Sequence, residues 1–92
     1  MTAVLVRITG VVQGVSFRYH AKEKAAALHL EGWVRNRIDG SVEVFFQGTD
    51  DAVQQGIDWC HTGPPMAAVE HIEISPMQPD QHLSGFRVRS TC

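Results

Sequence analysis

Short segments with the two-residue period of a β-strand alternate along this chain with segments that have the period of an α-helix. From Ala3 to Thr9 every second residue is branched and apolar, and apolar neighbours on the other side predict a central strand with both faces covered. A helix is predicted next, running to about Leu30 with Gly32 as its stop signal. Its apolar residues recur at spacings of four, four and three: Phe17, Ala21, Ala25 and Leu28.

The second half of the chain repeats this alternation. Strands are predicted from Trp33 to Arg35 and from Ser41 to Gln47, and Asp39-Gly40 between them is typical of a hairpin turn. A second helix follows, with Thr49 or Asp50 as its N-cap. The apolar side of this helix is predicted at Val53, Ile57 and Cys60, and the helix is predicted to end at residues 62–65. A strand at 67–75 and a short strand at 86–89 complete the prediction.

The resulting order is βαββαβ with a short extra strand at the C-terminal end. Two split β-α-β units of this kind pack both helices on one face of an antiparallel sheet, which is the ferredoxin-like plait of the α+β class. With 92 residues there is material for one hydrophobic core, so residues 1–92 are predicted to form a single domain.

Composition and charge exclude several classes of protein. The content of 43% hydrophobic and 20% charged residues is that of an ordinary globular chain. Eight Lys and Arg residues against ten Asp and Glu residues give no overall attraction to nucleic acid or to anionic lipid, so any anion site must be local. No apolar run approaches a membrane span, and the first residues do not resemble a signal peptide. We therefore expect a cytoplasmic protein, monomeric at this size.

Cysteine and histidine do not predict a metal site. Cys60 and Cys92 lack the spacing of a zinc or redox motif and are predicted to be unpaired thiols, although a bridge between them stays open. The five histidines also lack a ligand spacing. His20 is close enough in sequence to Arg18 to reach a site there, but an isolated histidine on a helix is more often a surface or packed residue.

The loop between the first strand and the first helix is the strongest candidate for chemistry. It reads GVVQGVSFR from Gly10 to Arg18, and Gly10 and Gly14 permit positive φ angles. Such a loop turns backbone N–H groups toward an anion at a helix N-terminus, where Arg18 can add a planar charged fork. The alternative interpretation is a flexible connector beside a surface arginine.

Asn36 is a second candidate, at the end of the second predicted strand. Its side-chain amide can both donate to and accept from one water molecule, and so orient that water for attack on a bound phosphorus atom. Asparagine is also common in turns, so a hairpin role is the plain alternative.

Together the two segments resemble the signatures of the acylphosphatase family, and the resemblance extends over essentially the whole chain. The first signature, G-x-V-Q-G-V-x-F-R, is matched at Gly10, Val12, Gln13, Gly14, Val15, Phe17 and Arg18. The second is matched at Gly32, Trp33, Val34, Asn36, Gly40, Val42 and Gly48. The fold known for this family is also the ferredoxin-like plait.

The resemblance implies metal-free hydrolysis, with no cofactor, of the carboxyl-phosphate anhydride of a small acyl phosphate to a carboxylate and inorganic phosphate. It assigns phosphate binding to Arg18, the orientation of water to Asn36, and support of that asparagine to Ser41. The phosphate cradle would be formed by Gln13, Gly14, Val15, Ser16, Phe17 and Arg18. Ser16 is not interpreted as a nucleophile. Inorganic phosphate, as the product, is expected to inhibit competitively.

Three alternatives from other functional classes require different sequence features. An RNA-binding plait needs an aromatic strand motif, but Phe45 and Phe46 are adjacent and must point to opposite faces. A metal carrier on this fold needs paired cysteines in the first loop, which has none. The remaining rival is a non-catalytic regulatory module that binds phosphate or an acyl phosphate; the presence of both Arg18 and Asn36 favours an enzyme.

Overall fold

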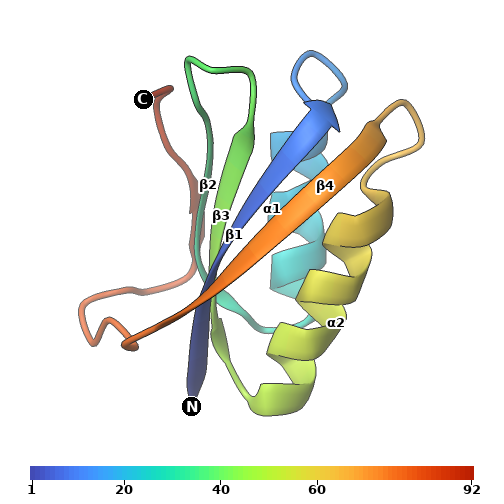
Figure 1. The fold of residues 1–92 in the computed structure, drawn as a ribbon. Coiled ribbons are helices and arrows are strands. Elements are labelled where there is room, and N and C mark those ends of the chain that lie inside the picture. Colours follow the sequence, from blue (N-terminus) through green and yellow to red (C-terminus); the bar gives the residue numbers. More distant parts are fainter.

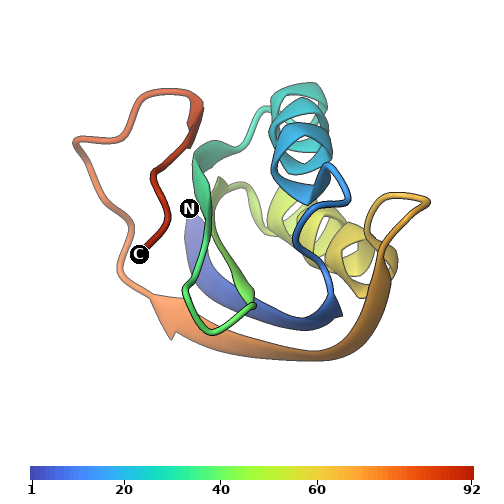
Figure 2. The same ribbon diagram turned by 90° about the horizontal axis from the view of Figure 1, so that it is seen from above.

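A computed structural model describes all residues from 1 to 92 and contains five strands and two helices. These are β1 (Thr2–Val11), α1 (Phe17–Ala27), β2 (Glu31–Asn36), β3 (Val42–Gly48), α2 (Asp50–Thr62), β4 (Ala68–Met77) and β5 (Phe86–Val88). The sheet has the strand order β4-β1-β3-β2-β5, and both helices lie on its concave side (Figures 1 and 2). The predicted ferredoxin-like plait of the α+β class is confirmed.

The fifth strand gives the sheet its one parallel pair. β1 pairs antiparallel with β3 and β4, and β2 pairs antiparallel with β3 through the predicted hairpin. β5 instead pairs parallel with β2. After β4 the chain loops out at the lower left of Figure 1 and enters β5 from the same end as β2, so the sheet as a whole is mixed rather than antiparallel.

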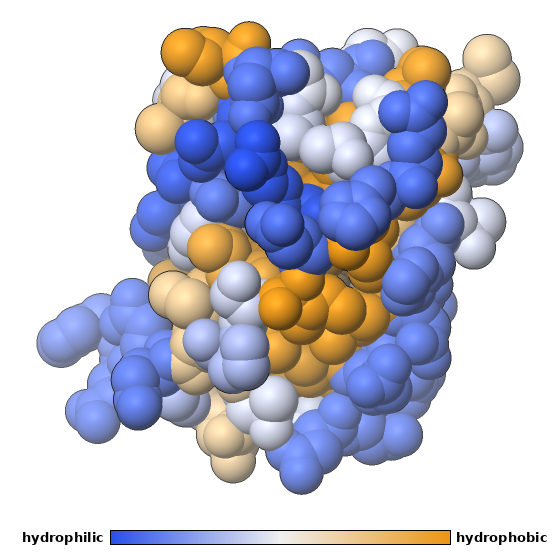
Figure 3. Space-filling view, in the orientation of Figure 1, coloured by the Kyte–Doolittle hydropathy of each residue, from blue (hydrophilic) through white to orange (hydrophobic).

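The core fills the space between the helices and the sheet. Most of its strand residues are branched, and Val6, Ile8 and Val44 are fully buried, while α1 contributes the small residues Ala21 and Ala25. Small side chains let the helix lie close to the sheet, where burial contributes about 25 cal/mol per Å² of apolar surface. On the face shown in Figure 3, an apolar patch between β4 and α2 is bordered by hydrophilic side chains.

The two faces of β3 separate the aromatic residues as the sequence predicted. Phe46 lies in the core, with its ring centroid 5.9 Å from that of Phe86. Phe45 lies on the opposite face and stacks on Trp33 at 6.0 Å. Arg35 and Arg89 place their guanidinium groups 4.8 and 4.7 Å from the Trp33 ring centroid.

The first helix ends earlier than its apolar pattern predicts. It stops at Ala27, and His29 takes the left-handed conformation with φ 57°. The backbone N–H of Leu30 then donates to the Ala25 carbonyl oxygen at 2.8 Å, which closes the helix in a Schellman arrangement. Gly32, predicted as the helix stop, lies inside β2 instead. It is needed there because a Cβ would come 1.8 Å from the Phe45 carbonyl oxygen.

The first strand is longer than predicted and includes the first glycine of the loop. β1 runs to Val11, and Gly10 lies at a bulge opposite β4. Its φ is +124°, and a Cβ would come 2.3 Å from the Ala68 carbonyl oxygen. Gly10 therefore serves strand pairing, and the irregular loop is limited to residues 12–16.

Several smaller predictions can also be compared with the structure. The hydroxyl oxygen of Thr49 accepts a hydrogen bond from the Ala52 N–H and caps α2, as predicted. Cys60 is buried and Cys92 is exposed, and the two are not bridged. Burial raises the pKa of the Cys60 thiol to about 12. Neither helix is long and apolar enough to span a bilayer.

Candidate active site

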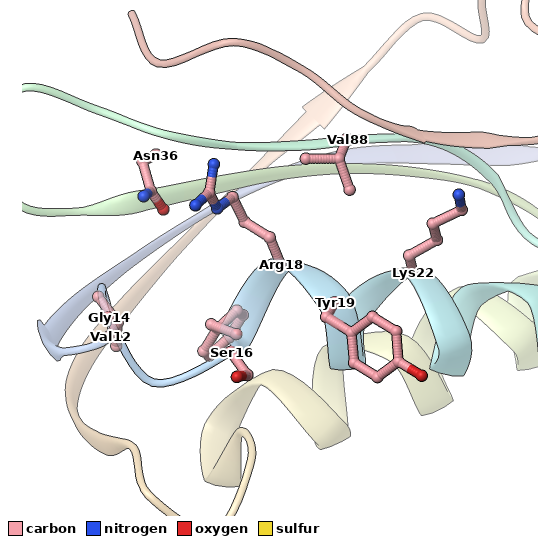
Figure 4. A pocket seen from close by; sticks show the side chains of 9 residues that line it. Val12, Gly14, Ser16, Arg18, Tyr19, Lys22, Asn36 and Val88 are labelled. Carbon is pink, nitrogen blue, oxygen red and sulfur yellow. The ribbon is translucent and has the colours of Figure 1, made fainter.

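An open pocket of about 630 Å³ lies between the beginning of α1 and the edge of the sheet formed by β2 and β5 (Figure 4). The loop before α1 forms one end of the pocket, and the first turns of the helix form its long wall. It is lined by Val12, Gly14, Ser16, Phe17, Arg18, Tyr19, Lys22, Asn36 and Val88. The pocket thus brings together the two candidate residues that the sequence places 18 positions apart.

Arg18 and Asn36 face each other at the loop end of this pocket. Arg18 projects from the first turn of α1, and its guanidinium group is directed toward Asn36 at the end of β2 (Figure 4). All four ion pairs of the structure use other arginines, so no carboxylate neutralises Arg18. The Asn36 backbone carbonyl oxygen accepts a hydrogen bond from the Cys92 N–H at 3.1 Å, which fixes this strand end. The unpaired guanidinium of Arg18 and the neutral side-chain amide of Asn36 therefore lie at the same end of the pocket.

The loop before α1, predicted to be the phosphate cradle, turns sharply at two residues. Gly14 has φ 75° and Ser16 has φ 62°, so the chain turns twice through the left-handed region. Ser16 occupies the N-cap position, but its side chain makes no capping hydrogen bond, and the first turn of α1 contains no acidic residue. The N–H groups of that turn therefore remain available to a bound anion at the positive end of the helix dipole. The Ser16 hydroxyl points away from Asn36 (Figure 4).

Gln13 fastens the loop to the hairpin between β2 and β3. Its side-chain amide donates to the carbonyl oxygens of Arg37 at 2.7 Å and of Ser41 at 2.8 Å. Its side chain is therefore engaged away from the pocket, which it does not line. Because Arg37 directly follows Asn36, these two bonds tie the cradle to the strand end that carries the asparagine.

Ser41 is buried, and its hydroxyl belongs to the hairpin turn. Its Oγ donates to Asp39 Oδ1 at 2.6 Å, and its backbone N–H donates to the same atom at 3.0 Å. These two bonds, with help from the charge of Arg7, lower the pKa of Asp39 to about 2. Any support that Ser41 gives Asn36 therefore passes through the turn and not through a direct hydrogen bond.

Val15 and Phe17 connect the loop to the hydrophobic core. Phe17 is 2% exposed and lies 5.2 Å from Trp59 between ring centroids. Val15 packs partly against the same core and does not line the pocket. These two side chains hold the loop in place, so Val15 and Phe17 can serve an anion only through their backbone N–H groups.

Four lining residues were not predicted: Val12, Tyr19, Lys22 and Val88. Lys22 had a usable signal, because it follows Arg18 by four residues and so shares its side of the helix. Val88 had none, since its place depends on the parallel pairing of β5 with β2. His20 does not line the pocket; its ring nitrogen lies 2.8 Å from the Ser16 carbonyl oxygen.

A glycine substitution tests whether the left-handed turn at Gly14 is needed for the cradle. A Cβ at Gly14 meets no atom within 4 Å, so Gly14→Ala strains only the backbone. An alanine in the left-handed backbone conformation is less stable by about 1–2 kcal/mol. We therefore expect the loop to leave this conformation and the phosphate affinity to fall by about tenfold. Calorimetric titration with inorganic phosphate measures it.

Gly85→Ala is the matched control for this test. Gly85 has φ 72° and equally open surroundings but lies outside the pocket. It should lose comparable stability and keep its phosphate affinity. Normal phosphate affinity in Gly14→Ala would contradict the role given to this turn.

Comparison with known proteins agrees with the fold and with the family that the sequence resembles. The acylphosphatase family model matches residues 4–88. An acylphosphatase of Azoarcus sp. (strain BH72) is 48% identical over 92 residues, which cover 100% of this chain and 93% of the relative. The crystal structure of acylphosphatase from Bacillus subtilis superposes with a TM-score of 0.92 at 31% identity, covering 97% of this chain and 99% of that one.

A second solved structure supports the same assignment. An acylphosphatase from Coxiella burnetii has a TM-score of 0.90 at 39% identity, and the match covers 96% of this chain and 92% of that one. The similarity in both sequence and structure extends over nearly the full length of each protein. On this evidence the chain belongs to the acylphosphatase family.

Proposed function

We propose that this protein hydrolyses the carboxyl-phosphate bond of acyl phosphates without a metal ion, with Arg18 and the loop amides binding the phosphate and Asn36 orienting the attacking water. Membership of the acylphosphatase family supports the reaction class. The observation that supports the roles of these residues is the position of the unpaired Arg18 guanidinium, which is directed at Asn36 beside the loop that contains the left-handed residues Gly14 and Ser16.

Phosphate binding follows from the charge of the pocket. A guanidinium group matches two phosphate oxygens with parallel hydrogen bonds, and free N–H groups at the start of α1 can bind the remaining oxygen. The pocket contains no acidic residue to compete for these donors. The phosphoryl group would therefore be held at the loop end, with its phosphorus atom near Asn36.

Asn36 suits the task of aligning a water molecule. Its amide has a donor and an acceptor side, so it can hold water in one orientation without carrying charge. A neutral residue also avoids repelling the phosphate, as a carboxylate in this position would. Correct placement alone contributes several kcal/mol to such a reaction.

The leaving group explains why so few residues are sufficient. A carboxylate, whose conjugate acid has a pKa of about 4, departs without being protonated, so no general acid is needed. Phosphoryl transfer then requires positioning and stabilisation of charge on the equatorial oxygens. Arg18 and the loop amides supply both in this proposal.

Inorganic phosphate should be both product and competitive inhibitor, because the cradle binds the part that substrate and product share. The groups to which this proposal gives a role, which are Arg18, Asn36 and the loop amides, all belong to one domain. We therefore infer that a monomer is sufficient for activity.

The test is release of phosphate from acetyl phosphate and benzoyl phosphate, each with and without EDTA. We expect rapid turnover of both substrates that EDTA does not change, with competitive inhibition by inorganic phosphate. Loss of turnover in EDTA, restored by adding a divalent metal, would contradict the metal-free mechanism. Binding of phosphate without any turnover would instead identify a regulatory module that only binds phosphate or acyl phosphates.

A further inference from the structure

Lys22 places a second positive charge in the same pocket, one helical turn beyond Arg18. Four residues of helix advance by about 6 Å, so both side chains leave the same side of α1. Lys22 lines the pocket, and its ammonium group extends toward the strands, as the Arg18 guanidinium does (Figure 4). Val88 of β5 lies between the two cations in this view and is 45% exposed.

Neither cation is neutralised by the protein. Lys22, like Arg18, takes part in none of the four ion pairs. The neighbouring acid on the helix, Glu23, accepts a hydrogen bond from the Tyr19 hydroxyl at 3.2 Å. Like charges four residues apart disfavour a helix, and the charge of Arg18 in the first turn opposes the helix dipole. An anion in the pocket would relieve both effects.

The pocket therefore has three parts in a row. The loop end, with Arg18 and Asn36, is the proposed phosphate site. The exposed methyl groups of Val88 form an apolar middle, and Lys22 supplies a cation at the far end. The Arg18 guanidinium leans toward Asn36 and the Lys22 ammonium extends away from it, so the two cations lie toward opposite ends of the pocket (Figure 4). A ligand in which a short carbon chain joins a phosphate to a carboxylate would place one negative charge toward each end.

We propose that Lys22 forms a second anion subsite, which makes the pocket selective for acyl phosphates whose acyl group carries its own negative charge. The simplest member of this class is the monoacyl phosphate of a dicarboxylic acid, such as succinyl phosphate. The proposal rests on the function proposed above, because it assumes that the phosphate occupies the Arg18 end. Val88 would cover the carbon chain between the two charges.

The size of the effect follows from the exposure of the lysine. Lys22 is exposed to solvent, and ion pairs at exposed positions contribute little. We therefore expect Lys22 to favour the charged ligand about three- to fivefold at low salt. The preference should shrink as salt rises, because the Debye length falls to about 8 Å at physiological ionic strength.

The experiment measures binding and turnover in parallel. The binding probes are 5-phosphonopentanoate and pentylphosphonate, which have the same chain length, cannot be hydrolysed as acyl phosphates, and differ in the carboxylate. The substrates are succinyl phosphate and acetyl phosphate. Each is measured with the unaltered protein, with Lys22→Gln, and with Lys24→Gln, which removes the same charge from α1 outside the pocket.

In Lys22→Gln the preference for the carboxylate-bearing probe should fall about three- to fivefold. The KM for succinyl phosphate should rise, while the kcat for succinyl phosphate and the turnover of acetyl phosphate should stay unchanged. Lys24→Gln should behave as the unaltered protein. Equal changes for both probes, or none, would overturn the subsite. If the unaltered protein binds the probes but hydrolyses neither substrate, the proposed function fails, and the probe affinities still decide the role of Lys22.

Discussion

Replacing Arg18 with alanine should lower kcat/KM for acetyl phosphate by about 10³- to 10⁵-fold, the range found when an arginine that stabilises a transferring phosphoryl group is removed. The loss is this large because the guanidinium is the only charged group at the phosphate end of the pocket. It would contact the phosphate before the reaction and follow its charge through the transition state. Phosphate release measures the rate, and calorimetry should find no measurable binding of inorganic phosphate.

Two further measurements show whether this loss comes from the site or from the fold. Arg18→Lys keeps the charge without the planar fork, so it should recover part of the phosphate affinity and little of the rate. Thermal unfolding of Arg18→Ala without phosphate should occur at the same or a higher temperature, since the like-charged pair with Lys22 is gone. Undiminished phosphate binding in Arg18→Ala would exclude this residue from the phosphate site.

Asn36→Ala should separate binding from chemistry. Removing one preorganised polar group of this kind costs about 3–4 kcal/mol of barrier, so kcat should fall by about 10²- to 10³-fold. Inhibition by inorganic phosphate should change little, because Arg18 and the loop amides remain in place. The two quantities are measured together by assaying acetyl phosphate hydrolysis over a series of phosphate concentrations.

The matched control for Asn36→Ala is Gln13→Ala. Gln13 touches the strand end next to Asn36 but not the pocket, so its loss should loosen cradle and asparagine together. It should therefore weaken phosphate inhibition and turnover in parallel. The same parallel loss in Asn36→Ala would show that Asn36 only holds the structure in place.

The sequence predicts the fold and the two facing side chains because these depend on local patterns. Alternation and helical spacing give the element order, and two spaced signatures give Arg18 and Asn36. What it does not predict depends on contacts between distant segments. Val88 reaches the pocket only because β5 pairs parallel with β2, and periodicity does not encode the direction of a three-residue strand.

The roles of some side chains and the ends of helices also depend on contacts that the sequence pattern does not encode. Gln13 belongs to the predicted cradle, but its amide binds a hairpin more than 20 residues away, at Arg37 and Ser41. The apolar pattern predicts too late an end for α1, because a histidine, His29, takes the left-handed position where a glycine would be expected. Gly32 therefore resembles a stop signal, although it serves close packing inside β2.

The hydrogen bond that Cys92 donates to the Asn36 carbonyl has a consequence for the stability of the active state. Arg89 makes a similar bond to the Val34 carbonyl oxygen at 2.8 Å, so the segment after β5 holds the edge of β2 up to the pocket. A three-residue edge strand and an exposed tail can detach at a lower free energy than the core needs to unfold. Detachment would leave the hydrophobic core intact while freeing Asn36 and removing Val88 from the pocket. The protein would then be folded but inactive, and its working temperature range would be set by this edge and not by its melting point.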